Sequence, residues 1–276
     1  GVANKGKVIV KGAGKVDLDG AVMNAAVQEV DASASTGGVY VDASTQTDFK
    51  FTGGSGDDRF QTDVALSTTT GSAGAVNGGA GTDRLIVNAS TDITEAIGAL
   101  YTNFEVLEVQ NAVSVDMDHV DGLTAVRINQ AGNATGVTDL SAADAAAITI
   151  VGTGAGAVTM AVKGAATIGQ IDTVTLAIDN GASAEADLVL TAPVMASVEN
   201  LVINAASDAV SISALTSAAA LTSIKVNATH SSAVTTSIVS GAVAFGTNTH
   251  IDASGSTGPV SINLNGIVNG TGAAAT

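Results

Sequence analysis

Two glycine–aspartate segments carry the residues best suited to binding a metal ion. Residues 53–61 are GGSGDDRFQ and residues 78–86 are GGAGTDRLI. Both match the nonapeptide G-G-x-G-x-D-x-U-x, where U is a large apolar residue, which binds calcium in parallel β-rolls. The glycines let the backbone turn tightly and aim carbonyl oxygens inward. Because calcium takes several oxygen ligands in a flexible geometry, two such turns stacked side by side could hold it.

The candidate calcium ligands come from both segments. They are Gly53, Ser55, Asp57 and Asp58 in the first and Gly78, Ala80 and Asp83 in the second. Asp57 is either an extra ligand or a group that supports the ligands. Phe60 and Leu85 are expected to enter the interior on short strands. The alternative is a pair of glycine turns that bind nothing.

The spacing of the two motifs predicts an enlarged coil. They start at residues 53 and 78, a step of 25 residues. One β-roll coil uses about 18 residues, the length of two nonapeptides. The polar stretch at residues 66–74 is therefore expected to bulge out as a loop.

Two further acidic clusters carry weaker hypotheses. Asp116, Asp118 and Asp121 alternate around Met117 and His119, which is typical of a solvated strand end or of a calcium loop. Three more acidic residues flank Asn180 and Gly181. A turn is a simpler explanation of this segment than a binding site. These three acids are Asp179, Glu185 and Asp187.

The sequence predicts no catalytic function. His119, His230 and His250 have no metal-ligand spacing, and neither HExxH nor GxSxG occurs. A polysaccharide lyase or hydrolase would use paired carboxylates. Such sites usually add aromatic and cationic side chains that hold the sugar. The chain has only two tyrosines and three arginines, and two of those arginines lie inside the calcium motifs.

Charge and composition narrow the possible partners. The formal net charge is −16, so nucleic acid is not an expected partner, whereas cations are. Lys5, Lys7, Lys11 and Lys15 form the one basic cluster, which is a solvated strand face or a contact for an anionic surface such as a polysaccharide or lipid head group. Without cysteine, rigidity must come from metal ions or from a long repetitive core. No apolar run is long enough to cross a membrane.

The chain repeats itself with a period of about 20 to 28 residues, which is the range of solenoid repeats. Residues 30–39 (VDASASTGGV) return almost unchanged as residues 251–260 (IDASGSTGPV). Short alternating strands are predicted at 106–110, 125–129, 147–151, 173–178, 200–204, 223–227 and 250–254. A second strand is predicted after each of these, at 112–117, 136–140, 157–162, 187–191, 209–214, 233–239 and 258–264.

These patterns predict an all-β fold, a parallel β-solenoid (β-helix or β-roll) with calcium-binding turns and a few short helical turns. Stacked coils bury the apolar stripe that one coil cannot bury alone. Short helical turns are expected at residues 92–100, 141–147 and 215–221, the first two with capping-box spacing. Asn129, Asn204 and Asn227 end strands at matching places, either as stacked amide ladders or as ordinary turn residues. A weak break near residue 90 separates an N-terminal part (1–90) with the calcium turns from continuing coils (91–276).

Taken together, the nonapeptides, the Ala/Val/Thr/Ser/Gly-rich repeats, the acidic balance and the absence of cysteine resemble bacterial surface-layer (S-layer) proteins of the RTX type. Strand sequences such as NFEVLEV (103–109) and SVENLVI (197–203) add to the resemblance. It implies an extracellular, self-assembling coat on a Gram-negative cell, exported by type I secretion and assembled with calcium. The export signal expected of such proteins is not evident, so the chain is expected to be a fragment.

Two other functions stay open at this point. One is an RTX-type adhesin or repeat module that binds a host or a glycan. The other is a non-catalytic RTX module of a secreted enzyme whose catalytic domain lies elsewhere.

Overall fold

The predicted fold class is confirmed in a computed structural model. The chain is an all-β solenoid of about nine turns, with about 50% strand and 6% helix. The structure describes residues 6–19, 26–43, 45–69, 74–111, 113–129, 136–152, 155–179, 188–207, 209–215, 220–231, 235–240 and 249–263. Two compact units divide it, Gly1–Val126 and Arg127–Thr276. The weak break predicted near residue 90 stays a prediction.

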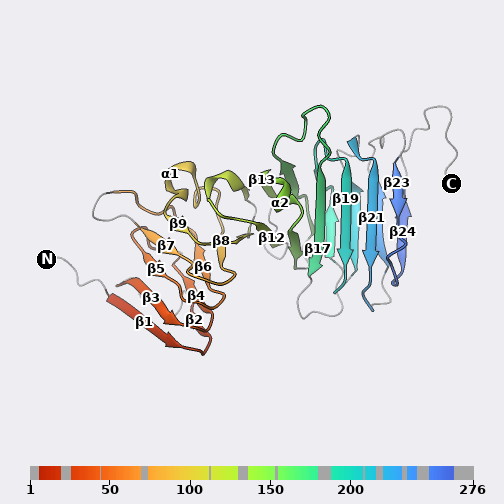
Figure 1. Cartoon of the computed structure of the whole chain (residues 1–276). Coiled ribbons are helices and arrows are strands. Elements are labelled where there is room, and N and C mark those ends of the chain that lie inside the picture. Colours follow the sequence, from red (N-terminus) through yellow and green to blue (C-terminus); the bar gives the residue numbers. More distant parts are fainter. Residues whose placement is uncertain are drawn as a thin grey trace, which may run out of the picture. The chain divides into compact units, whose positions relative to one another are not determined.

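The N-terminal unit stacks its coils in two parallel ladders (Figure 1). One ladder follows the order β1 (Gly6–Gly12), β3 (Val27–Ser35), β5 (Lys50–Thr52), β7 (Ala75–Asn77) and β9 (Tyr101–Thr102). The other follows β2 (Val16–Leu18), β4 (Val39–Asp42), β6 (Arg59–Thr62), β8 (Arg84–Val87) and β10 (Val106–Val109). Each coil contributes one strand to each ladder. β11 (Ser114–Asp116) and a short 3-10 turn, η1 (Met117–His119), follow.

The C-terminal unit repeats this plan (Figure 1). The division between the units falls within β12 (Ala125–Asn129). One ladder contains β14 (Ile148–Val151), β17 (Thr173–Asp179), β19 (Asn200–Ala205), β21 (Ser223–Ala228) and β23 (His250–Asp252). The facing ladder contains β15 (Ala155–Gly156), β18 (Leu188–Thr191), β20 (Val210–Leu215), β22 (Thr236–Ser240) and β24 (Val260–Asn263). In addition, β13 (Gly136–Leu140) pairs with β16 (Thr159–Val162).

In-register pairing turns the alternating sequence into columns of like residues. Burial alternates along β17 and β19, so every second side chain enters the interior. Val174 pairs with Leu201, and Leu201 with Ile224. Each apolar side chain therefore packs on its counterpart in the next coil, which is how thin coils build a continuous core.

The two units fill their interiors differently. In the N-terminal unit Phe49, Phe51, Phe60, Tyr101 and Phe104 are at most 1% exposed. The Phe51 and Phe60 rings stack with centroids 5.7 Å apart. The largest fully buried side chains described in the C-terminal unit are aliphatic. The aromatic residues in the described part of the chain therefore concentrate around the glycine–aspartate turns.

Of the predicted helical turns, one has the expected cap and one does not. α2 (Ala142–Ala145) begins with the predicted capping box between Ser141 and Asp144. α1 (Glu95–Gly98) has Thr94 as its N-cap and no side-chain cap. The capping box predicted from Asp92 is wrong, because the Asp92 carboxylate turns back to accept the backbone N–H groups of Asn88 and Ala89. Most of the third predicted turn, residues 216–219, lies outside the described part of the chain.

The near-duplicated segments fold alike although they lie in different ladders. Thr36 and Gly37 both donate backbone N–H groups to the carbonyl of Gly12, one coil away. Thr257 and Gly258 do the same to the carbonyl of Ala228. Of the three asparagines of the predicted amide ladder, Asn204 and Asn227 are in contact, since Asn227 Nδ2 donates to Asn204 Oδ1 at 2.8 Å. These backbone hydrogen bonds and the asparagine contact link one coil to the next.

Candidate calcium-binding turns

The two nonapeptides stack directly on each other. Arg59 and Arg84 are register partners, as are Phe60 and Leu85 one position on. The Ala80 N–H donates to the Gly54 carbonyl at 2.9 Å, and the Arg84 N–H donates to the Asp58 carbonyl at 2.9 Å. Phe60 and Leu85 are both fully buried, as predicted. The 25-residue step is therefore one coil, and a 2.9 Å hydrogen bond from the Gly74 N–H to the Ser67 carbonyl closes the base of its loop.

Close backbone approach explains the first glycine of each motif. A Cβ on Gly53 would lie 1.7 Å from the Gly78 carbonyl oxygen and 2.5 Å from Asp58 Oδ2. A Cβ on Gly78 would lie 2.1 Å from the Asn103 carbonyl oxygen. Any side chain at these positions would separate the coils. The glycines thus bring peptide groups of adjacent coils together beside the two aspartates.

The motif aspartates are fully buried and bind backbone N–H groups. Asp58 Oδ1 accepts the Val39 N–H at 2.6 Å, and Asp58 Oδ2 accepts the Gly54 N–H at 2.7 Å. Asp83 Oδ1 accepts the Asp58 N–H at 2.7 Å. Asp83 Oδ2 is buried and has no hydrogen-bond partner. One carboxylate is therefore fully engaged, and the other keeps a free oxygen.

A third acid belongs to the same column, although it lies outside both nonapeptides. Glu105 stands immediately before β10, as Asp58 and Asp83 stand before β6 and β8, and Glu105 Oε2 accepts the Asp83 N–H at 2.7 Å. The signal was present in NFEVLEV, but without glycines it does not match the nonapeptide. We call Asp58, Asp83 and Glu105 the acid column.

The same backbone arrangement also occurs without glycines. In the C-terminal unit Glu199 Oε2 accepts the Asp172 N–H at 2.8 Å. Asp172 also keeps a buried oxygen without a hydrogen-bond partner. A carboxylate at a corner that accepts a backbone N–H of the previous coil is therefore found in both units of this solenoid. What distinguishes the acid column is the stacked glycine backbone beside it.

Burial dominates the electrostatics of the acid column. Desolvation, together with the negative charges of Asp58, Glu105 and Asp57, raises the pKa of Asp83 to about 6, against the Asp58 N–H group that lowers it. Desolvation also raises the pKa of Asp58, against the backbone N–H groups that lower it. The negative charge of an ionised carboxylate in this position is not balanced, and a bound cation would balance it.

The remaining predicted ligands lie at the surface of the turns. Asp57 is exposed, and its Oδ1 accepts the Thr82 N–H at 2.9 Å. Ser55 and Ala80 are exposed and join the coils through backbone N–H groups. Among the described residues, no three acidic or histidine side chains gather into a metal-binding group. Calcium fits this donor set only if backbone carbonyls of the glycine turns supplement Asp83, and such carbonyls are ordinary calcium ligands.

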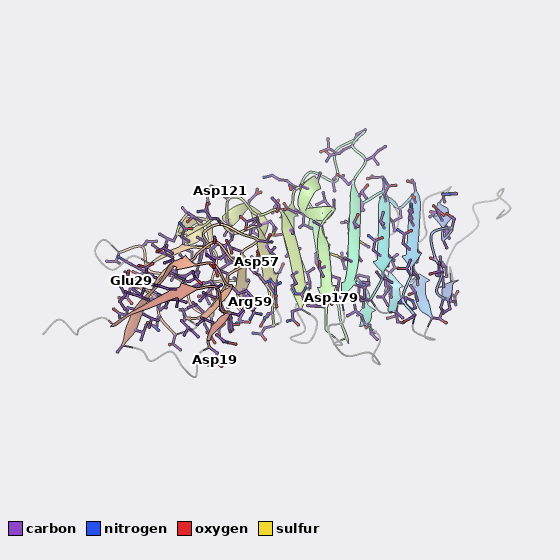
Figure 2. All side chains as sticks on the ribbon, turned by 60° about the horizontal axis from the view of Figure 1, so that its bottom comes forward. Asp19, Glu29, Asp57, Arg59, Asp121 and Asp179 are labelled. Atoms are coloured by element: carbon purple, nitrogen blue, oxygen red, sulfur yellow. The ribbon has the colours of Figure 1, made fainter. Side chains whose placement is uncertain are left out.

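The other acidic clusters have local partners. Asp116 Oδ1 accepts the Asp118 N–H and caps η1, and Asp116 Oδ2 lies 3.7 Å from His119 Nε2. Asp121 is exposed at the surface (Figure 2). Asp179 pairs with Arg127 at 3.1 Å. Glu185 and Asp187 fall outside the described residues.

In comparisons with known proteins, no family model, curated protein or solved structure matches the chain. Within the described part of the chain, no helix has the length and apolar character needed to cross a membrane.

Proposed function

We propose that the chain is a calcium-dependent structural subunit of a bacterial surface-layer lattice, with no catalytic role. The observation that supports it best is the stacking of two calcium-type nonapeptides beside a buried carboxylate oxygen without a hydrogen-bond partner. The net charge of −16 adds a reason for cation dependence, because copies of an acidic chain repel one another until cations screen them.

In this proposal calcium sits at the glycine–aspartate turns of the N-terminal unit. Asp83 would be the principal carboxylate ligand, and the backbone of Gly53, Ser55, Gly78 and Ala80 would add carbonyl oxygens. Bound calcium would neutralise buried carboxylate charge and tie two coils together. Self-association at an extracellular cell surface, and contact with a cell-surface polysaccharide, belong to the same proposal.

Calorimetry and electron microscopy test the two halves of this proposal. We expect calcium to bind, to raise the melting temperature reversibly with respect to chelator, and to produce ordered sheets of protein. Asp83→Ala should weaken calcium binding by about tenfold or more, because it removes the carboxylate whose oxygen is free. Absence of calcium binding in the wild-type chain would overturn the whole proposal. Calcium binding with persistent monomers would instead favour an adhesin-type repeat module.

A further inference from the structure

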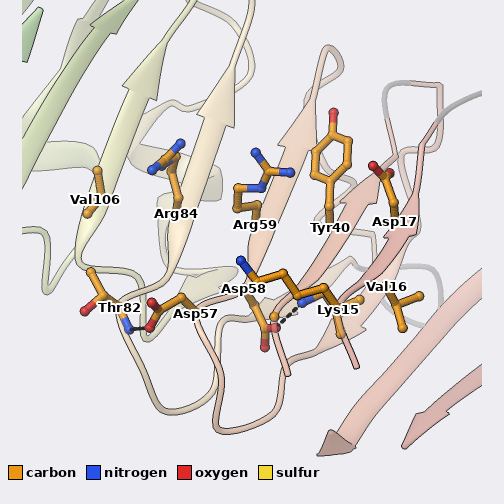
Figure 3. Close-up of a pocket in the computed structure, with 12 residues that line it drawn as sticks. Lys15, Val16, Asp17, Tyr40, Asp57, Asp58, Arg59, Thr82, Arg84 and Val106 are labelled. Carbon is orange, nitrogen blue, oxygen red and sulfur yellow. Dashed lines mark hydrogen bonds between the residues drawn. The ribbon is translucent and has the colours of Figure 1, made fainter. Parts of the chain in front are cut away.

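The N-terminal unit carries a groove of about 500 Å³ beside the glycine–aspartate turns (Figure 3). Its polar lining consists mainly of Lys15, Asp17, Tyr40, Asp57, Arg59 and Arg84. The groove crosses successive strands of one ladder, so it runs from coil to coil. It borders the acid column, because the lining residues Val39 and Arg84 both donate backbone N–H groups to Asp58.

One wall of the groove is a row of in-register side chains. Asp17 pairs with Tyr40, Tyr40 with Arg59, Arg59 with Arg84, and Arg84 with Val106. In Figure 3 these side chains project to the same side of neighbouring strands. Adjacent strands lie about 4.8 Å apart, so the five positions span roughly 19 Å. A linear molecule lying along this row would meet a new side chain at every coil.

The centre of the row is an aromatic and cationic pair. The Arg59 guanidinium carbon lies 4.7 Å from the centroid of the Tyr40 ring. Arg59 is exposed and has no ion-pair partner among the described residues, whereas Arg84 pairs with Glu108 at 3.0 Å. The Tyr40 hydroxyl donates to Gln61 Oε1 at 2.8 Å, which fixes the ring. A fixed ring with a guanidinium of unused hydrogen-bonding capacity is suited to hold a ligand.

The mixture of positive and negative charges in the groove indicates which class of ligand it can bind. Cations at Lys15 and Arg59 share the groove with carboxylates at Asp17 and Asp57, so a polyanion would be repelled as well as attracted. An extended peptide would need a free strand edge, whereas this groove lies on the face of paired strands. Sugar hydroxyls both donate and accept hydrogen bonds, and the C–H face of a pyranose ring can pack on tyrosine.

We propose that this groove binds a linear, hydroxyl-rich polysaccharide, with Tyr40 as the packing surface and Arg59 and Asp17 as hydrogen-bonding partners of the hydroxyls. The sugar chain lies along the row and contacts equivalent positions of successive coils. The proposal locates the polysaccharide partner of the proposed coat, but the groove needs neither calcium nor a lattice to exist.

The test is binding of linear neutral hexasaccharides (glucan, xylan and mannan) by calorimetry, beside a hexagalacturonate. We expect at least one neutral hexasaccharide to bind, and both Tyr40→Ala and Arg59→Ala to weaken binding about tenfold or more. Tyr40→Phe keeps the ring and should stay within about threefold of the wild type. Lys225→Ala, which removes an exposed cation on β21, is the matched control and should change nothing.

Three results would overturn the groove assignment. These are no binding of any hexasaccharide, binding that Tyr40→Ala and Arg59→Ala leave unchanged, and binding limited to the galacturonate and abolished by salt. Circular dichroism of each variant checks that the fold is kept. A calcium titration of the same variants separates the two proposals. Normal calcium binding without sugar binding removes only the groove, and sugar binding without calcium binding removes only the metal site.

Discussion

At the scale of single residues, the buried carboxylate of Asp83 is the most informative feature of the N-terminal unit. It is fully buried, accepts a backbone N–H of the previous coil through Oδ1 and leaves Oδ2 without a hydrogen-bond partner. Burial raises its pKa from 3.8 to about 6. Either a proton or a cation can compensate the charge of this oxygen, so acidity and calcium should act on the same group.

The first prediction concerns the pH dependence of stability without calcium. Because the folded state holds the Asp83 proton more tightly than the unfolded state, its contribution to the free energy of unfolding grows as pH falls from about 6 to about 4 and is lost as pH rises through about 6. Asp83→Asn keeps an acceptor for the Asp58 N–H and should flatten that slope. Urea unfolding at several pH values measures it.

Asp121→Asn, at an exposed carboxylate, is the control for this experiment and should keep the wild-type slope. Added calcium should also reduce the slope in the wild type, because a bound cation keeps Asp83 ionised. An Asp83→Asn profile that parallels the wild type between pH 4 and 6 would remove Asp83 as the responsible group.

The second prediction tests the glycine contact between coils. Gly53→Ala places a Cβ 1.7 Å from the Gly78 carbonyl oxygen, so the coils must move apart, and we expect a loss of about 2 kcal/mol or more in unfolding free energy. Gly14→Ala is the matched control, because a Cβ there meets nothing within 4 Å. It should change stability by less than about 0.5 kcal/mol. Equal effects of the two substitutions in urea titrations would contradict the close contact.

At the scale of elements, the strands were predictable and the corners were only partly so. Ile and Val alternate with polar residues in 223–227, and β21 occupies Ser223–Ala228 with alternating burial. Periodicity reports which face is buried, so it finds strands. Periodicity does not show which backbone group a carboxylate side chain will bind. Asp92 looks like a helix cap by spacing but binds the preceding turn, and Glu105 joins the acid column through a contact between coils.

The third prediction compares two corner glutamates that make the same hydrogen bond. Glu105→Gln and Glu199→Gln both retain an oxygen that accepts the N–H of the previous coil, so each should cost less than about 1 kcal/mol of stability. Only Glu105 lies beside the glycine turns. Glu105→Gln should therefore lower calcium affinity about threefold to tenfold, while Glu199→Gln leaves it unchanged. Calorimetric titration decides, and equal calcium affinities in the two variants would exclude Glu105 from the site.

At the scale of the whole molecule, charge is distributed unevenly between the units. Residues 1–126 contain 7 Lys and Arg and 17 Asp and Glu, a net charge of −10, whereas residues 127–276 contain 3 and 9, a net charge of −6. The acid column, the glycine turns and the buried aromatic cluster all lie in the first unit. The second unit is held by in-register aliphatic columns and an amide contact. Calcium should therefore stabilise one unit and leave the other nearly unaffected.

Hydrogen exchange followed by mass spectrometry measures that difference directly. On addition of calcium, we expect amides in residues 74–111 to exchange at least about tenfold more slowly, because a bound cation joins two coils and opposes their local opening. Amides in residues 220–231, which belong to β21 and its flanks, should keep their rates. Asp83→Ala should abolish the calcium-dependent protection while leaving residues 220–231 unchanged. Protection that spreads equally over both regions would mean that calcium acts on the chain as a whole, through its net charge, rather than at the glycine–aspartate turns.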